Sequence, residues 1–332
     1  MHPWNAQVWE SLVQKTDRLP HALLIHGRPG IGKLALAERF AQLLLCEAKP
    51  RGAEPCGACP ACRWFLIGNH PDYRRVEPES LAPPAAADGE EERKAAKASK
   101  PSTEIKIDQV RELAGFLNIA SHRGRHRIVL LRPAEDMNSH AANALLKALE
   151  EPPSSAMFIL VSHRPERLLA TIRSRCVALP VPPPDEKLAR EWLAGQGVED
   201  AARWLVFAGG APLRAREYAQ DARGELIGEM LAALHAQDGA RLTALVRDRE
   251  ALEVLAEVLH KHALDRSLAA LGAAPMFATA KAGAGEGDAR SWLAFARRMG
   301  RNRQLARHPL NPGLFAGEMV AGLPARRESR KA

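Results

Sequence analysis

The stretch Gly27-Arg-Pro-Gly-Ile-Gly32-Lys33-Leu34 decides the fold of this chain. An apolar run over residues 21–26 precedes it, and residues 34–45 follow with apolar side chains at helical spacing. A strand, a glycine-rich loop and a helix in this order are the context of a P-loop, where backbone N–H groups and a lysine hold a polyphosphate. The stretch therefore predicts a P-loop on a parallel sheet, and the alternative is a plain Gly/Pro turn.

The metal site of this loop is incomplete. In a hydrolysing P-loop the residue after the lysine supplies the hydroxyl that holds Mg²⁺, and here that residue is Leu34. The next apolar strand, residues 127–131, should end in an acidic pair, but Arg132-Pro133 follows it. Glu135-Asp136 lies a few positions later and is the open alternative source of metal ligands. Binding of ATP or ADP remains open for this site, whereas hydrolysis is not expected.

Four of the five cysteines form a tight cluster, at Cys46, Cys56, Cys59 and Cys62. Four thiolates with two residues between successive ligands suit a closed tetrahedral zinc site, which leaves no position for water or substrate. A redox Cys-x-x-Cys pair is the alternative, but the third cysteine nearby favours metal. We therefore expect a structural zinc module over residues 46–62. His70 is not needed as a ligand.

Composition places the chain among ordinary globular proteins. Its 332 residues suit two or three domains, and 46% hydrophobic residues are enough for real cores. The net charge of +8 fits work near nucleic acid but is weak evidence. The N-terminus lacks the basic region and apolar run of a secretory signal, and no stretch is long and apolar enough to span a membrane. The clustered cysteines indicate a reducing cytoplasm.

Strand and helix patterns alternate up to residue 182, which predicts a parallel sheet covered on both faces. Residues 77–104 are rich in Pro, Ala, Glu and Lys and are expected to be a disordered insertion. Only helical patterns follow the proline run at 180–184. These helices are predicted at 185–195, 199–208, 213–235, 239–272 and 289–321, with a break near 281–287.

The order of these motifs resembles that of the bacterial clamp-loader subunits of the AAA+ family. The matching stretches are HALLIHGRPGIGK from His21, the four-cysteine insert before His70-Pro-Asp72, AANALLKALEEPP from Ala141 and TIRSRC from Thr171. The resemblance implies an α/β fold with three parts. An AAA+ P-loop domain with the zinc module would cover 1–182, a small helical lid 183–224, and an all-helical oligomerisation collar 225–332.

The resemblance also assigns roles to residues. The nucleotide site would comprise Gly27, Gly30, Gly32 and Lys33, with Arg214 in the sensor 2 region. The polar sensor 1 position would fall on Ser162 or His163. Arg175 would reach across a subunit interface to a neighbour's nucleotide as an arginine finger, and the four cysteines would hold zinc.

The implied function is that of the non-hydrolysing subunit of the DNA polymerase III clamp loader, part of a DNA polymerase holoenzyme. The implied partners are gamma- or tau-like ATPase subunits, a clamp-opening delta-like subunit, and through the complex the sliding clamp and primed DNA. No membrane partner is implied. Two other functions stay open, namely an active P-loop ATPase motor subunit of the loader and a zinc-dependent nucleic-acid adaptor.

Two arginine sites also have local interpretations. Arg175 could simply favour the end of a helix or pair with a nearby carboxylate, and Arg173 is the nearest arginine to confuse with it. The basic cluster over residues 122–127 could touch DNA inside a ring of subunits, or be a solvated turn.

Overall fold

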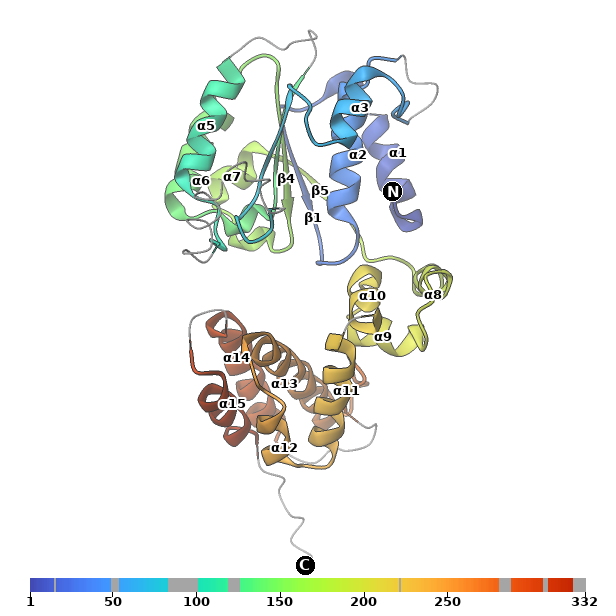
Figure 1. Ribbon diagram of the computed structural model, residues 1–332, viewed down its shortest axis with the longest axis vertical. Helices are drawn as coiled ribbons and strands as arrows, with labels where there is room; N and C mark the ends of the chain where they lie inside the picture. The colour runs from blue at the N-terminus through green and yellow to red at the C-terminus, as the bar shows by residue number, and fades with distance from the viewer. Residues whose placement is uncertain are drawn as a thin grey trace, which may run out of the picture. The chain divides into compact units, whose positions relative to one another are not determined.

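The computed structural model describes residues 1–14, 16–48, 54–82, 101–118, 126–220, 222–280, 288–306 and 310–324. The chain divides into two compact units, Met1–Pro184 and Asp185–Ala332 (Figure 1). Within the described ranges, no helix combines the length and the apolar character that crossing a membrane requires.

A five-stranded parallel sheet forms the centre of the first unit. Its strands are β1 (Ala22–His26), β2 (Tyr73–Val76), β3 (Arg127–Leu131), β4 (Ala156–Ser162) and β5 (Val177–Pro180), in the order β2-β3-β4-β1-β5. Strand β1 pairs with β4 from Ala22 opposite Phe158 and with β5 from Leu23 opposite Val177. Every residue of β3 and β4 is buried, as expected for a parallel sheet covered on both faces. The predicted parallel sheet is therefore confirmed.

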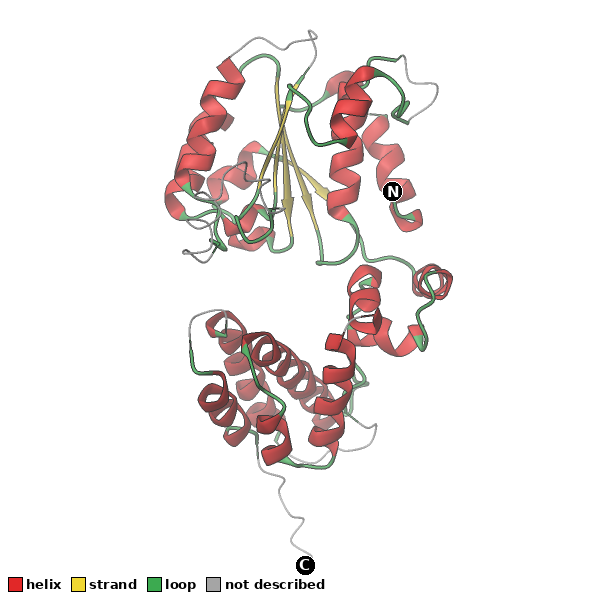
Figure 2. Ribbon diagram, in the orientation of Figure 1, coloured by secondary structure: helices red, strands yellow, loops and turns green. Residues whose placement is uncertain are grey.

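Helices cover both faces of this sheet (Figures 1 and 2). One side carries α1 (Ala6–Val13), α2 (Lys33–Leu45) and α3 (Pro60–Leu66), and the other carries α5 (Ile107–Asn118), α6 (Ser139–Glu150) and α7 (Ala170–Arg175). Single 3-10 turns lie at η1 (Pro3–Asn5), η2 (Thr16–Arg18), η3 (Ala134–Asp136) and η4 (Pro165–Arg167). Alternate strand residues such as Leu24, Val129 and Phe158 face the core beneath α5 and α6. This packing fixes the strand ends that carry the site.

The segment expected to be a disordered insertion, residues 77–104, is only partly described. Residues 83–100 lie outside the described ranges. At the edges the expectation was wrong, because Ser80 N–H donates to the Ser102 carbonyl at 3.0 Å and Lys106 Nζ lies 2.7 Å from Glu79 Oε1. These contacts hold the two ends of the segment together.

In its described residues the second unit contains helices and no strand (Figure 2). They are α8 (Glu186–Gly195), α9 (Ala201–Phe207), α10 (Pro212–Gln220), α11 (Ala222–His235), α12 (Gly239–Ala244), α13 (Arg249–Ala270), α14 (Ala289–Leu305) and α15 (Pro312–Ala321). The helical character of this region was predicted correctly.

Three predicted helices were wrong in length, since each is two helices. The prediction at 213–235 becomes α10 and α11, that at 239–272 becomes α12 and α13, and that at 289–321 becomes α14 and α15. Local caps explain the later breaks, because the Asp248 carboxylate accepts from Ala251 N–H and the Asn311 amide oxygen accepts from Leu314 N–H. Near the first break, Gly224 allows α11 to approach the end of α10 closely, because a Cβ there would lie 1.9 Å from the Tyr218 carbonyl oxygen.

Candidate functional site

The predicted P-loop joins the end of β1 to the start of α2. Gly30 and Gly32 adopt φ values of 77° and 82°, in the left-handed region that favours glycine. Lys33 is the first residue of α2, and its ammonium donates to the carbonyls of Gly27 at 2.7 Å and Arg28 at 2.6 Å. Burial lowers the pKa of Lys33 to about 8, which nearby Glu135 partly opposes. The loop thus has the lysine and glycines of a phosphate site.

The N-terminal turn η1 packs on the outside of this loop. Trp4 indole N–H donates to the Ile31 carbonyl at 2.9 Å, and the Asn5 amide donates to the same oxygen at 3.2 Å. A Cβ on Gly32 would lie 2.3 Å from the His2 ring. This close approach gives Gly32 a packing role in addition to its backbone conformation, which the sequence pattern alone did not reveal.

The positions that should hold Mg²⁺ carry other chemistry. Leu34 is a partly exposed residue in the first turn of α2 and offers no oxygen ligand on its side chain. Arg132, directly after β3, forms an ion pair with Glu77, so a cation occupies the place expected for a carboxylate. At both positions where a metal ligand was expected, the residue present cannot bind Mg²⁺.

The alternative metal ligands Glu135 and Asp136 both lie in η3, and the sensor 1 position falls at the end of β4. Glu135 Oε1 accepts from the backbone N–H of His163 at 2.9 Å, while its Oε2 is buried and makes no hydrogen bond among the described residues. Ser162, the last residue of β4, is fully buried, and its hydroxyl accepts from the Arg164 N–H at 3.1 Å. These contacts tie the ends of β3 and β4 together beside Lys33.

The four clustered cysteines converge as predicted. Cys46 directly follows α2, Cys59 caps the start of α3, and the four Sγ atoms of Cys46, Cys56, Cys59 and Cys62 all lie within 4.8 Å of one another. A tetrahedral zinc with Zn–S bonds near 2.3 Å separates its sulfur ligands by about 3.8 Å, and Cys56 Sγ lies 3.9 Å from Cys62 Sγ. Backbone N–H groups of Cys56, Cys59 and Cys62 point at the preceding Sγ atoms at 3.3–3.4 Å. This arrangement is compatible with zinc binding.

His70 lies close in sequence but belongs to a different contact. Its ring is buried and Nδ1 accepts from the Asp72 N–H at 3.0 Å. Among the described residues, the group with metal-ligand spacing comprises only the four cysteines.

Arg175 ends helix α7 at the surface. Its guanidinium lies 2.6 Å from Glu150 Oε1 and donates to the Thr171 carbonyl at 3.0 Å. Glu150 is the last residue of α6, so two neighbouring helix ends fix this side chain. Glu150 belongs to the quoted LEEPP stretch, but no role was predicted for it. Because Glu150 and Arg175 are 25 positions apart, no local sequence pattern indicates that they pair.

Arg214 lies in the second unit, on α10. Its Nη2 lies 3.0 Å from Glu257 Oε1 on α13, and the Tyr218 hydroxyl donates to the same oxygen at 2.6 Å. Lys261 Nζ lies 2.8 Å from it. Burial disfavours the charged form of Glu257, but Lys261 and Arg214 outweigh burial and hold the pKa of that carboxyl below its ordinary value. Sequence analysis missed Glu257, although its i, i+4 spacing with Lys261 was visible.

The basic cluster at 122–127 lies mostly outside the described residues. Arg127 is described, on β3, and is 2% exposed. Its guanidinium contacts the Phe116 carbonyl and lies 3.6 Å from Asp72. The hypothesis of a DNA contact was therefore wrong for Arg127, because its side chain is buried in the core.

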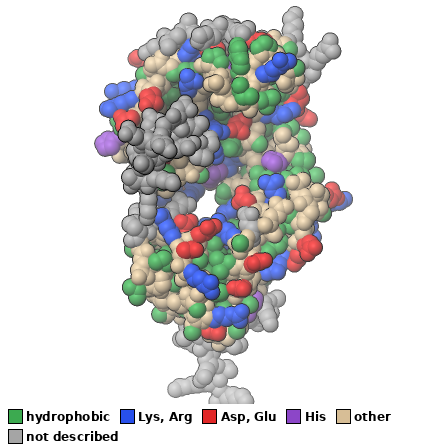
Figure 3. Space-filling view, viewed as in Figure 1, with side chains coloured by type: hydrophobic (Ala, Val, Ile, Leu, Met, Phe, Trp, Pro, Cys, Tyr) green, Lys and Arg blue, Asp and Glu red, His purple; other side chains and the backbone are tan. Residues whose placement is uncertain are grey.

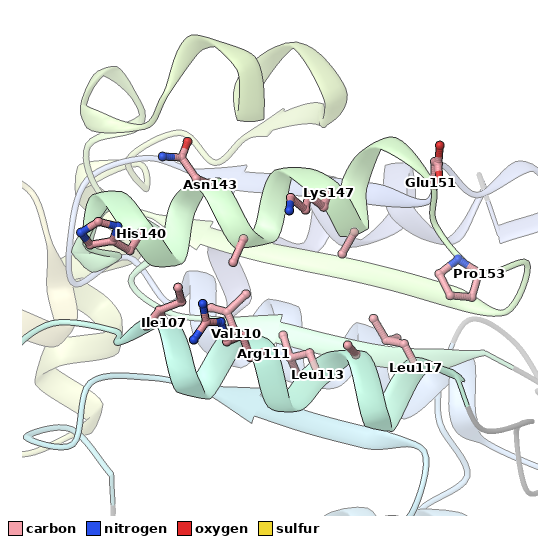
Figure 4. A pocket seen from close by; sticks show the side chains of 13 residues that line it. Ile107, Val110, Arg111, Leu113, Leu117, His140, Asn143, Lys147, Glu151 and Pro153 are labelled. Carbon is pink, nitrogen blue, oxygen red and sulfur yellow. The ribbon is translucent and has the colours of Figure 1, made fainter.

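A groove of about 530 Å³ lies between α5 and α6, and no P-loop residue lines it (Figure 4). Its floor is apolar, with Val110, Leu113 and Leu117 from α5, and Lys147 and Glu151 lie along its rim.

Comparison with known proteins places the chain in a family. A family model described as "DNA polymerase III, delta subunit" matches residues 4–185. DNA polymerase III subunit delta′ of Pseudomonas aeruginosa is 42% identical over 220 residues, which are 65% of this chain and 60% of that protein. The subunit delta′ of Yersinia pestis is 34% identical over 275 residues, 80% of this chain and 72% of that protein.

A solved structure supports the fold alone. A DNA polymerase III gamma subunit-related protein of Thermotoga maritima superposes with a TM-score of 0.52 at 17% identity, over 94% of this chain and 97% of that one. The matching family model covers the whole P-loop, the cysteine cluster and Arg175. The chain therefore belongs to the family of the DNA polymerase III delta′ subunit.

Proposed function

We propose that this chain is the non-hydrolysing subunit of a clamp loader, which loads the sliding clamp onto primed DNA and supplies Arg175 to a neighbouring ATPase site. The relatives that carry the name delta′ support the assignment to DNA polymerase III. The proposed partners are gamma- or tau-like ATPase subunits and a clamp-opening delta-like subunit. The chain contributes to the polymerase holoenzyme without being an enzyme on its own.

One observation carries the proposal: Arg175 stands partly exposed at a helix end while the chain's own loop lacks metal ligands. Leu34 and Arg132 occupy the positions that should hold Mg²⁺, and one carboxylate oxygen of Glu135 accepts from the His163 backbone N–H. A subunit that hydrolysed its own ATP would need those ligands. The combination supports a subunit that completes another's site, and it weighs against the active-motor alternative.

The local contacts of Arg175 suit a group that acts after assembly. Its pair with Glu150 leaves 34% and 49% of the two side chains exposed, and such surface pairs contribute about 0–1 kcal/mol. A polyphosphate in the adjacent subunit, with several charges and bidentate oxygens, can therefore displace Glu150. Positive charge placed on a phosphoryl group in transfer is worth about 10³ to 10⁵ in rate.

The remaining sites receive supporting roles. Gly27, Gly30, Gly32 and Lys33 are assigned to a nucleotide-binding loop without hydrolysis. Arg214 is assigned to the sensor 2 region of the second unit, where it pairs with Glu257. The four cysteines are assigned to one structural zinc. The lid over 183–224 and the collar over 225–332 are proposed as parts of the second unit, with the collar serving assembly.

Assembly tests this function directly. The purified chain is mixed with the gamma- or tau-like and delta-like subunits of its own organism, and the mixture is resolved by size-exclusion chromatography with ATPase assays across the fractions. We expect a stable complex with turnover confined to it. A chain that stays monomeric in the mixture, or that hydrolyses ATP alone and loses this on Lys33→Ala, would contradict the proposal.

A further inference from the structure

Helix α14 carries a strongly one-sided charge. Its 17 residues contain no Asp or Glu. They contain five arginines, namely Arg290, Arg297, Arg298, Arg301 and Arg303. Exposed helices usually mix both signs, which lets i, i+4 pairs offset one another. On the face shown in Figure 3, acidic and basic side chains are both present and interspersed. The composition of α14 is therefore unusual for a helix that is merely solvated.

The buried and charged faces of α14 lie opposite each other. Trp292, Phe295 and Met299 are buried in the core of the second unit. At about 100° per residue, Arg290, Arg297 and Arg301 fall within roughly 20° of one line on the far side. With a rise of about 1.5 Å per residue, this line extends over about 16 Å. We call these three residues, all exposed, the arginine stripe.

Two members of the stripe have no partner within the part of the chain that the structure describes. Arg303 lies 3.9 Å from Glu257, and Arg298 donates to the Gly322 carbonyl at 2.7 Å. Arg297 and Arg301, by contrast, make no side-chain hydrogen bond or ion pair among the described residues. They are four residues apart, so their like charges repel and destabilise the helix. An anion bound along the stripe would remove this repulsion.

We propose that the arginine stripe binds the phosphate backbone of duplex DNA. Guanidinium groups match phosphate oxygens through paired N–H donors. A single strand would need aromatic side chains on which its bases could stack, but Trp292 and Phe295 are only 6% and 3% exposed. A protein partner would need an apolar centre, whereas this line carries guanidinium groups with Ala294 between them. The exposed Leu293 and Leu305 fall about 60° to opposite sides of the line and near its two ends, so they do not form such a centre. The stripe is thus a direct DNA contact in the second unit, and it does not depend on the role proposed for Arg175.

The experiment uses the full chain alone, so its outcome is independent of assembly. Fluorescence anisotropy measures binding of a labelled 20-base-pair duplex from low to 0.3 M salt. The test variant is Arg297→Gln with Arg301→Gln, and the control is Arg190→Gln with Arg241→Gln, which removes the same charge from other exposed positions of the second unit. Circular dichroism verifies that both variants are folded.

Loss of two phosphate contacts should reduce the slope of log K against log salt by about 1.8 and weaken binding at least about tenfold at 0.1 M salt. The control should keep the wild-type slope. A 20-nucleotide single strand should bind more weakly than the duplex, and polyglutamate should compete poorly. The proposal is overturned if the test variant matches the control, if the wild type does not bind the duplex, or if the single strand or polyglutamate binds equally well.

Discussion

Replacing Glu257 by Gln tests whether one buried carboxylate organises the second unit. Glu257 on α13 is 4% exposed, and Lys261, one turn later, is 6% exposed. Lys261 Nζ lies 2.8 Å from Glu257 Oε1, and Arg214 lies 3.0 Å from the same oxygen. Glutamine keeps the shape of the side chain but removes its charge. The variant therefore leaves a buried ammonium without its counter-ion.

The expected cost follows from that uncompensated charge. Removing one partner of a buried ion pair typically destabilises a protein by about 3–5 kcal/mol. The partly exposed Arg214 can reach water, so the lower end applies, at about 3 kcal/mol. This corresponds to a decrease of roughly 100-fold in the protection of α13 amides against hydrogen exchange, if they exchange through opening of this unit.

Acid should produce the same loss in the wild type. The pKa of Glu257 is held below its ordinary value of 4.5. The stability that its charge contributes is therefore present above pH 4.5 and is lost as the pH falls toward the folded-state pKa.

Hydrogen exchange with mass spectrometry on the full chain measures this effect in α13 and α11 separately from the first unit. The matched control is Glu253→Gln on the same helix, whose carboxylate is 35% exposed and lies 3.9 Å from Arg249. Surface pairs of this kind contribute about 0–1 kcal/mol. Equal protection of α13 in the two variants would show that Glu257 does not organise this unit. Glu257→Gln with Lys261→Met should recover part of the loss, because the buried charge is then absent.

Three further predictions concern other parts of the chain. In chemical denaturation, Gly224→Ala should destabilise the second unit by about 1–3 kcal/mol, because its Cβ would lie 1.9 Å from the Tyr218 carbonyl oxygen. The matched variant Gly228→Ala should instead stabilise α11 by about 0.5–1 kcal/mol, because no atom lies nearer than 3.9 Å to its Cβ. Metal analysis should find about one zinc per chain, and Cys62→Ser should lose it together with the exchange protection of α3; a folded wild type without metal would contradict the site. Burial lowers the pKa of Lys33 to about 8 from 10.5, so stability measured against Lys33→Met should rise between pH 8 and 10.5, and a flat difference would show that the lysine is not buried as described.

The local parts of the fold were predictable because their signals are short in sequence. The strand before Gly27, the loop and α2 are adjacent in the chain, and glycine conformation and apolar spacing specify them. The four cysteines are likewise close in sequence, and their spacing alone predicted the cluster. The breaks between helices were less predictable. The close approach of Gly224 to the Tyr218 carbonyl depends on the folded chain, and in the sequence the capping residue Asp248 looks like any surface aspartate.

The contacts that set the chemistry of the candidate site were not predictable from spacing. Glu150 meets Arg175 across 25 positions, and Arg214 meets Glu257 across 43. His2 and Asn5 lie against Gly32 only because η1 folds back on the loop. Motif reading identified Arg175 and Lys33 as residues of interest, but their partners depend on packing between elements. Side-chain partners of this kind require the three-dimensional structure.

Arg175 is proposed to act in a neighbouring subunit while this chain hydrolyses nothing. DNA- and clamp-stimulated ATP turnover by the reconstituted loader carrying Arg175→Ala tests this, with Arg173→Ala on the same short helix as the matched control. We expect turnover at the site completed by this subunit to fall by about 10³ or more, which removes that site's share of the total, while the control complex and complex assembly are unchanged. Wild-type turnover and clamp loading by the Arg175→Ala complex would contradict it.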